Sequence, residues 1–451
     1  MTQDMNRHFS MSALLKYTFP TICMMIFTSL YEVVDGFFVS NFVGKTALAA
    51  VNLAWPVVMI LATVGLMTGT GGSALVAKTR GEGDDERANR YFSMLVIFTI
   101  VLAIVLAVLG QWMLVPLLEL FGAQGALLDE SVVYGRWVLL ALPFYALQFA
   151  FQIFYSTAGK PNYGFYVIVA AGVVNVVLDW LFICVLGWGI AGGAIATALG
   201  QVVGGLVPLI YFLRKHNSSL LRLVRTRLEW RPIGRSCLNG CSEVVSNIAM
   251  SLVTMLYNFQ LMRYIGEDGV AAFSVIGYTA MIFGAIFMGY ALGSSPLMSY
   301  QYGARNHKEM RSILFKSLGF IGIGSVLMFL AAECLAGPLS AIFVSYDAAL
   351  LEFTVNAYQI YAFAFLIMGL PIYASALFTS LGNGVVSAVI AFLRTIVLEC
   401  GAVLLLPLIL GIDGIWLSVT VGELAAAILA ACLMVVFRKR YGYDKRGAVK
   451  Q

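Results

Sequence analysis

The chain of 451 residues is 61% hydrophobic and only 11% charged, whereas soluble domains are about 45–50% apolar and about 25% charged. Apolar runs longer than about 18 residues recur along its whole length, which predicts a helical, polytopic membrane protein rather than a soluble one. The net charge of +5 gives no reason to expect nucleic acid as a partner, because the basic residues follow the membrane topology.

The apolar runs predict an all-α fold with twelve transmembrane helices. The spans cover residues 12–40, 46–78, 91–118, 132–156, 163–186, 191–213, 236–264, 268–300, 312–337, 350–380, 386–409 and 415–437. We expect no cleavable signal peptide, because the first run carries acidic residues at its far end and lacks a small-residue cleavage pattern. The seven cysteines stand apart and predict neither a disulfide framework nor a metal site.

The basic residues predict which side of the membrane each loop faces. They gather between spans two and three, between spans six and seven, and in the tail, whereas the opposite loops are acidic. Because cytoplasmic loops carry the excess of Lys and Arg, both termini are predicted to be cytoplasmic.

The sequence also repeats itself. "GKTALAAVN" at 44–52 aligns with "GEDGVAAFS" at 266–274, and "GIAGGAI" at 189–195 aligns with "GIDGIWL" at 411–417, both at an offset of 222. Each half contains an even number of spans, so both halves enter the membrane in the same direction. The pattern therefore predicts two parallel six-helix lobes related by a pseudo-two-fold axis along the membrane normal.

This repeat divides the chain into four parts. We expect an amino-terminal lobe at 1–213, a basic cytoplasmic linker at 214–235, a carboxy-terminal lobe at 236–437 and a basic cytoplasmic tail at 438–451. Two parallel lobes that face each other suit alternating access around a central cavity.

Span one carries two acids in the stretch "YEVVD". Glu32 and Asp35 are three residues apart and share a helix face, although each charge costs roughly 2.5–3.5 kcal/mol in a bilayer on insertion scales. Pro20 lies fifteen residues before Asp35 and is a candidate hinge, since it removes a backbone donor from the helix. A structural helix–helix hydrogen bond is the alternative explanation for Asp35.

Spans five and six add further polar residues. Asn175 and Asp179 are four apart and share a helix face, as do Thr197 and Gln201. At the repeat offset, Asp35 falls on Tyr257 and Asp179 falls on a glycine, so the second lobe lacks these acids. The asymmetry predicts a function carried by the amino-terminal lobe.

The second lobe has its own ionisable residues. Arg394 and Glu399 are five apart in span eleven and are candidates for an ion pair, whereas Glu423 falls on Gln201 at the repeat offset. Numerous aromatic and methionine side chains, Tyr278 and Met281 among them, are mostly core or lipid-facing. A minority are expected to line a cavity for flat, apolar or cationic molecules.

These motifs resemble the multidrug and toxic compound extrusion (MATE) transporters, and within them the prokaryotic DinF-like and MepA-like members. The resemblance covers nearly the whole chain: two six-helix lobes, the repeated "LAAVN"-type and "GARN"-type segments, and the intracellular linker. It departs from the NorM-like branch, because the tenth span, "YAFAFLIMGLPIYASALF", holds no acid.

The resemblance implies an H+ or Na+ coupling site in the amino-terminal lobe, formed by Asp35, Asn175, Asp179 and Thr197. Glu32 and Gln201 are candidate supporting residues. It implies no cofactor and no enzymatic activity. It implies instead a secondary active exporter in a prokaryotic inner (cytoplasmic) membrane, expected to be a monomer, that exchanges H+ or Na+ for small organic cations by alternating access.

Two rival functions remain open. The first is a related flippase for lipid-linked precursors, which should line its cavity with several arginines. Only Arg394 and Arg263 are available for that role. The second is a membrane-embedded enzyme with Asp35 and Asp179 as a catalytic pair, although the G-x-G-D pattern of intramembrane aspartyl proteases is absent. No G-x-x-x-x-G-K-[ST] nucleotide-binding motif is present either.

Overall fold

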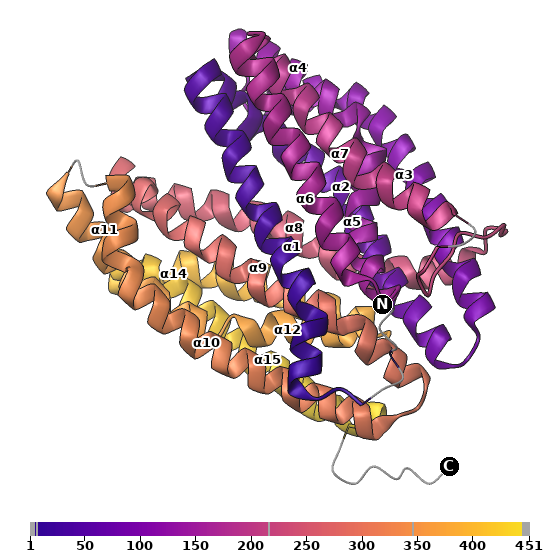
Figure 1. Cartoon of the computed structure of the whole chain (residues 1–451). Helices are drawn as coiled ribbons and strands as arrows, with labels where there is room; N and C mark the ends of the chain where they lie inside the picture. Colours follow the sequence, from indigo (N-terminus) through magenta and orange to yellow (C-terminus); the bar gives the residue numbers. More distant parts are fainter. Residues whose placement is uncertain (1–4, 6–7, 215–216, 345–346, 444–451) are drawn as a thin grey trace.

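The computed structural model describes residues 5, 8–214, 217–344 and 347–443, and the regular structure within these ranges is helical. Two lobes meet at one end of the molecule and diverge toward the other (Figure 1). The amino-terminal lobe comprises α1 (Met11–Phe38), α2 (Lys45–Gly81), α3 (Asp85–Leu120), α4 (Ala126–Leu140), α5 (Leu142–Thr157), α6 (Pro161–Asp179) and α7 (Gly189–Leu213). The carboxy-terminal lobe comprises α8 (Trp230–Tyr264), α9 (Glu267–Gly303), α10 (His307–Val344), α11 (Ala348–Ala362), α12 (Gly369–Ser380), α13 (Gly384–Phe392), α14 (Cys400–Leu410) and α15 (Ile412–Tyr441).

Four short segments interrupt or extend these helices. Three are π-helical, namely η1 (Val39–Val43), η2 (Trp180–Val185) and η4 (Leu393–Glu399), and η3 (Phe363–Leu366) is a 3-10 turn. Single-turn π segments are often found at functional sites, and two of the three lie next to predicted site residues.

The predicted count of twelve transmembrane helices is confirmed. Eleven helical segments among the described residues are long and apolar enough to cross a membrane, and α4 with α5 forms a twelfth that is bent by 57°. The sequence predicted a single span at 132–156 and gave no indication of this bend. Its cause is Pro143 in the first turn of α5, which has no backbone N–H to continue the ladder from α4.

The internal repeat reappears in the helix boundaries. α2 begins at Lys45 and α9 at Glu267, and α4 begins at Ala126 and α11 at Ala348, so both pairs of helix starts are separated by the repeat offset. The two-lobe, pseudo-two-fold architecture is therefore as predicted, and equivalent helices hold equivalent places.

The lobes touch through glycines at the end where they meet. A Cβ built on Gly81 of α2 would lie 2.1 Å from the backbone oxygen of Tyr300, and one built on Gly303 of α9 would lie 2.0 Å from that of Lys78. These contacts are each other's counterparts at the repeat offset. Only glycine lets the two backbones come this close, so α2 and α9 cross in direct contact at the pseudo-two-fold axis.

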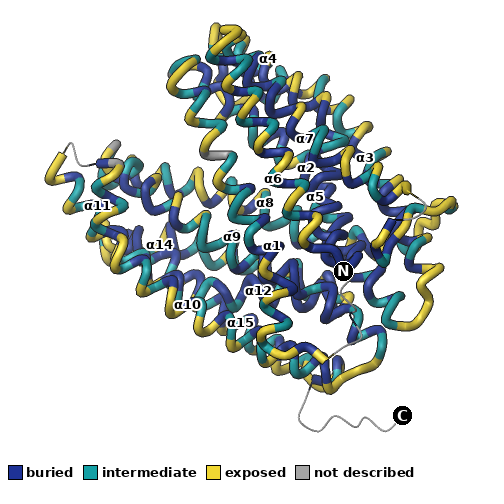
Figure 2. Tube along the Cα trace, viewed as in Figure 1, coloured by how far each residue is buried: buried dark blue, intermediate teal, exposed yellow. Residues whose placement is uncertain are grey.

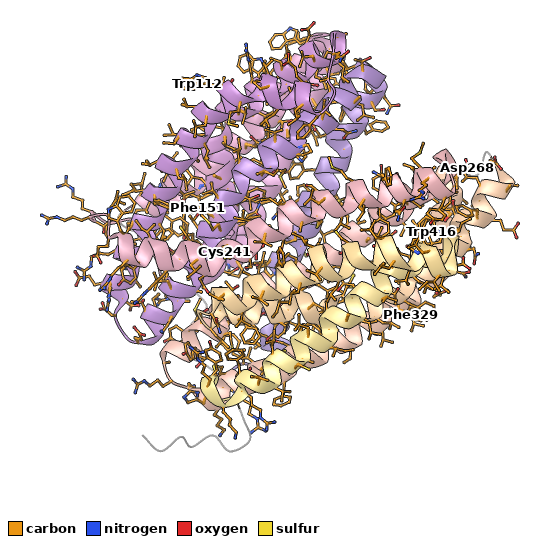
Figure 3. The ribbon with its side chains drawn as sticks, turned by 180° about the vertical axis from the view of Figure 1, so that it is seen from behind. Trp112, Phe151, Cys241, Asp268, Phe329 and Trp416 are labelled. Carbon is orange, nitrogen blue, oxygen red and sulfur yellow. The ribbon has the colours of Figure 1, made fainter. Side chains whose placement is uncertain are left out.

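The first helix of each lobe also packs against the other lobe. Met5 and Phe9, which precede α1, are buried in the core of the carboxy-terminal lobe, whereas Ile233 near the start of α8 is buried in that of the amino-terminal lobe. Figure 3 shows Cys241 of α8 where the two lobes meet. The adjacent Gly240 approaches α2 so closely that a Cβ would lie 2.0 Å from the backbone oxygen of Met67.

Apolar side chains cover the outward faces of the lobes. Trp112 on α3, Ile409 on α14 and Val436 on α15 are 77%, 82% and 71% exposed. Figure 2 shows such exposed positions along the outer helices and buried positions inside each lobe. An exposed apolar surface of this extent fits contact with lipid rather than water.

Candidate functional site

The predicted site lies in the amino-terminal lobe, where α1, α6 and α7 come together. Asp35 occupies the last turn of α1, and its Oδ1 accepts a hydrogen bond from Thr197 Oγ1 of α7 at 3.3 Å. Asn175 and Asp179, one turn apart on α6, lie within electrostatic reach of the Asp35 carboxylate. The four side chains that the sequence singled out are thus neighbours, although they come from three helices.

Asp179 is the most deeply buried member of the group. It is 0% exposed, and among the residues that the structure describes, neither Oδ1 nor Oδ2 has a hydrogen-bond partner. The charged group that acts on it is the Asp35 carboxylate. An unpaired buried polar atom costs about 1–3 kcal/mol, and a charged one costs more. A proton or a cation beside the two carboxylates would offset this cost.

Amide groups extend this unsatisfied set. Asn175 is 3% exposed and Gln201 is 4% exposed, and within the described chain both polar atoms of each amide lack a hydrogen-bond partner. Carboxylate, amide and hydroxyl oxygens are the ligands that hard cations such as Na+ prefer, and carboxylates also accept protons. The donor set fits either coupling ion.

Close helix packing positions these side chains. A Cβ on Gly200 of α7 would lie 3.0 Å from Cβ of Asn175, so the glycine allows α7 to pack directly on α6. α6 ends at Asp179 and continues as the π-helical η2, which shifts the register of the backbone immediately after the acid.

The sequence also named two further residues, Glu32 and Pro20, on the first span. The side chain of Glu32 lies outside the described residues. Pro20 lies inside α1, which runs as one helix through it, far along the chain from Asp35. Its role as a hinge stays a prediction.

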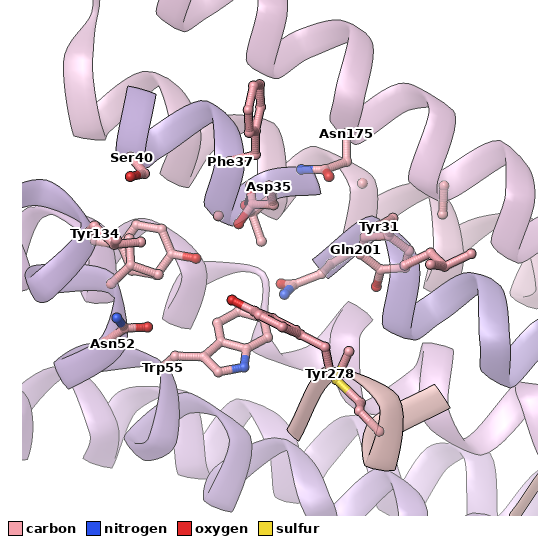
Figure 4. Close-up of a pocket in the computed structure, with 18 of the residues that line it drawn as sticks. Tyr31, Asp35, Phe37, Ser40, Asn52, Trp55, Tyr134, Asn175, Gln201 and Tyr278 are labelled. Carbon is pink, nitrogen blue, oxygen red and sulfur yellow. Dashed lines mark hydrogen bonds between the residues drawn. The ribbon is translucent and has the colours of Figure 1, made fainter. Parts of the chain in front are cut away.

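A cavity of about 670 Å³ opens beside Asp35. Asp35, Asn175, Thr197 and Gln201 all contribute to its lining, but buried Asp179 does not. Figure 4 shows the Asp35 carboxylate on one side of this space and the rings of Trp55 and Tyr278 across from it. Other lining residues include Tyr31, Phe37, Asn52, Tyr134, Gln148 and Met281.

Most of the lining comes from the amino-terminal lobe, but α9 contributes Tyr278, Met281 and Ile282 from the other lobe. The sequence named Tyr278 and Met281 only as members of a large aromatic and methionine set. Trp55 and Gln148 were missed. For Gln148 an indication existed, because it and Gln152 form an amide pair four residues apart within an apolar span.

The second lobe pairs its charges differently from the sequence prediction. Arg394 was expected to pair with Glu399, but its guanidinium bonds Glu423 on the facing helix α15, with Nε 3.0 Å from Oε1 and Nη2 2.5 Å from Oε1. Glu423 offers both oxygens, because Nε also lies 3.1 Å from Oε2. This two-oxygen contact is the geometry that guanidinium groups favour.

Comparisons with known sequences and with solved structures point to the same protein family. The sequence profile of the MatE family matches residues 20–181 and 244–405, one stretch in each lobe. The multidrug export protein MepA of Staphylococcus saprophyticus is 22% identical over 96% of this chain and 95% of its own length. MepA of Staphylococcus aureus strain MRSA252 is 20% identical over the same shares.

Solved structures share the fold. A MATE crystal structure in the straight conformation superposes with a TM-score of 0.90 at 21% identity, over 96% of each chain. An outward-facing multidrug resistance MATE transporter of the MOP superfamily superposes with a TM-score of 0.88 at 23% identity, also over 96% of each chain.

Proposed function

The chain belongs to the MatE family of transporters, and from this we propose that it is a secondary active multidrug exporter that exchanges H+ or Na+ for organic cations by alternating access. The observation that carries the proposal is the cavity in which the Asp35 carboxylate faces aromatic side chains. The MepA relatives are named multidrug export proteins, which supports the export of drug-like compounds.

The coupling ion binds at Asp35, Asn175, Asp179 and Thr197. Two carboxylates side by side in a buried pocket repel one another, and a proton or Na+ relieves that repulsion. Gln201 supports the site through the amide that it presents to the same cavity. We keep Glu32 as a second supporting residue from its place on the sequence.

Substrate and ion exclude each other at Asp35. This residue belongs to the carboxylate pair and also lines the cavity, so a bound organic cation and a bound coupling ion compete for one charge. A ligand shifts a conformational equilibrium only through its different affinity for the two states. Competition at a shared carboxylate supplies this difference, because the ion and the substrate each favour a different arrangement of α1.

The driving force depends on how much net charge the exchange moves. One charge entering down roughly 150 mV supplies about 3.5 kcal/mol, since 100 mV is worth about 2.3 kcal/mol per charge. At about 1.4 kcal/mol per tenfold, this sustains a gradient of a few hundred-fold for a neutral substrate. A one-for-one exchange with a monovalent organic cation moves no net charge, so its driving force is the concentration gradient of the coupling ion alone.

The same proposal covers topology. The protein is a multi-pass membrane protein, and we place both termini, the 214–235 linker and the 438–451 tail on the cytoplasmic side, with a monomer as the working unit. The flippase alternative receives no support from the cavity, since none of its described lining residues is Lys or Arg and a pyrophosphate would need them.

The test uses purified protein in liposomes, with a pH gradient and a Na+ gradient imposed separately, and follows efflux of a fluorescent organic cation. Asp35→Asn and Asp179→Asn should abolish gradient-driven efflux, and Asp35→Asn should lose ion-dependent substrate release. Glu333→Gln on α10 is the control and should keep most of the activity. Full gradient-driven efflux in Asp35→Asn would refute the proposal, and equal loss in all three variants would indicate a folding defect.

A further inference from the structure

The carboxy-terminal lobe contains a buried cluster of charges that the proposed mechanism does not use. Arg394 of η4 pairs with Glu423 of α15, and the Glu423 side chain is only 5% exposed. Glu399, at the end of η4, lies within electrostatic reach of both. Three ionisable groups thus share one place between η4 and α15, deep in an apolar lobe where each charge is costly.

This place is the structural counterpart of the ion site in the other lobe. Gly200 packs against Asn175, with 3.0 Å between a built Cβ and the Asn175 Cβ. Gly422, the counterpart of Gly200 at the repeat offset, packs against Glu399, with 3.0 Å from a built Cβ to the Glu399 Cα. Glu399 therefore makes the contact with Gly422 that Asn175 makes with Gly200, although it lies two residues beyond Val397, the counterpart of Asn175 at the repeat offset. Glu423, which follows Gly422 as Gln201 follows Gly200, occupies the position of Gln201.

The first helix of each lobe completes the correspondence. Tyr257 of α8 is the counterpart of Asp35 of α1 at the repeat offset, and its hydroxyl lies 2.6 Å from Ser418 Oγ of α15. Asp35 likewise meets Thr197 of α7, the helix equivalent to α15. In each lobe the first helix therefore makes a polar contact with the equivalent helix, α1 with α7 and α8 with α15.

The two places differ in how their charge is balanced. The amino-terminal site holds two carboxylates, and no described residue lining its cavity is Lys or Arg. The carboxy-terminal place also holds two carboxylates, Glu399 and Glu423, but with the Arg394 guanidinium bonded to one of them. The guanidinium, a cation attached to the chain, lies beside the carboxylates of this lobe, whereas the described residues place no such group beside the carboxylates of the other lobe, which could bind a free cation.

We propose that Arg394 is a tethered cation that fills, in the carboxy-terminal lobe, the place that the coupling ion takes in the amino-terminal lobe, so that only one lobe exchanges ions. The proposal rests on the exporter function proposed above. A tethered cation cannot leave, so the Glu423 carboxylate stays paired through the cycle. Each transport cycle then uses one ion-binding site.

The test measures the thermal melting of purified full-length protein in detergent, with millimolar guanidinium chloride as the probe and N-methyl-D-glucamine chloride at equal ionic strength as the control. Asp35→Asn removes the amino-terminal carboxylate that lines the cavity, and the Asp35→Asn protein alone is the reference against which a response of the other lobe is measured. In that background Arg394→Ala should lower the Tm by roughly 5 °C, because it leaves buried carboxylates uncompensated. Added guanidinium should restore the lost Tm, with an effect that saturates as its concentration rises.

Matched variants decide the result. Adding Glu423→Gln to the Arg394→Ala/Asp35→Asn protein should remove the guanidinium response, and Arg394→Lys/Asp35→Asn should show none because it keeps a fixed charge. If guanidinium stabilises all these proteins equally or none of them, the inference is wrong. If the Arg394→Ala protein does not fold, Arg394→Gln replaces it. An Arg394→Gln protein as stable as the Arg394→Lys protein overturns the inference. If the Arg394→Gln protein fails to fold and the Arg394→Lys protein folds, the need for a fixed charge is supported.

A separate measurement tests the exporter proposal itself. Wild-type protein should be stabilised by its coupling ion, in a Na+ or pH titration, and Asp35→Asn should not. If both respond alike, the amino-terminal site is wrong, while the guanidinium result still decides the role of Arg394.

Discussion

Replacing Gly303 by alanine should push the lobes apart at the end where they now meet. The added Cβ would lie 2.0 Å from the backbone oxygen of Lys78, whereas ordinary van der Waals contact begins at 3.4 Å, so the two backbones must separate. The neighbour is backbone and cannot rotate away. Overpacking of this kind costs roughly 1–3 kcal/mol, which favours the arrangement with this end open by roughly 5- to 150-fold.

The assay is an electron paramagnetic resonance distance between spin labels at Glu86 and Lys308. These exposed residues begin α3 and α10, equivalent helices of the two lobes, and the labels require a background free of the seven native cysteines. Gly303→Ala should lengthen the label distance and slow efflux. Gly277→Ala, on the same helix with nothing within 4 Å of its built Cβ, should change neither.

The reciprocal contact provides a further check on this reasoning. Gly81→Ala should have the same effect, and the double variant should cost less than the two single effects combined, because one separation relieves both clashes. An unchanged label distance in Gly303→Ala at wild-type stability would show that the lobes do not rely on this contact, and would refute the argument.

Three predictions concern the site. Thr197→Val removes a hydroxyl that donates to Asp35 and should weaken the apparent affinity for the coupling ion by roughly 2- to 10-fold, whereas Thr63→Val, whose hydroxyl bonds its own helix, should not. Tyr278→Ala should raise the KM for organic cations and leave the ion dependence of melting unchanged; a shift in both would place Tyr278 in the ion site. Gln148→Leu removes a buried amide oxygen that lacks a partner among the described residues, so it should preserve thermal stability. In competition assays the variant should prefer more apolar substrates than the wild type does. A large loss of Tm would contradict this.

Local sequence spacing singled out the polar residues of the candidate site, and the resemblance to the MATE transporters grouped them across three helices. Asn175 and Asp179 stand one helical turn apart, and a carboxylate or amide within an apolar span is informative by itself because its cost in a bilayer is high. The repeat offset likewise predicted the two lobes, since it is set by helix lengths that both halves share.

Contacts between distant helices were not predictable in this way. Tyr278 reaches the cavity only because α9 crosses toward the other lobe. Arg394 pairs with Glu423 rather than with Glu399, which is nearer in sequence, because the facing helix presents both carboxylate oxygens. The bend between α4 and α5 depends on Pro143, whose position in a first turn is clear only once the helix ends are known.

Helix α1 links the proposed ion site to both lobes, because its two ends are held by different lobes. Before its start, the backbone N–H of Phe9 and the ring of His8 bond the Glu309 carboxylate of α10 at 2.9 and 2.6 Å. At its far end Asp35 bonds Thr197. An ion that changes the fit of Asp35 in one lobe therefore acts on a helix anchored in the other. Pro20, between these anchors, is where the helix lacks a backbone hydrogen bond and where strain from either end can be absorbed.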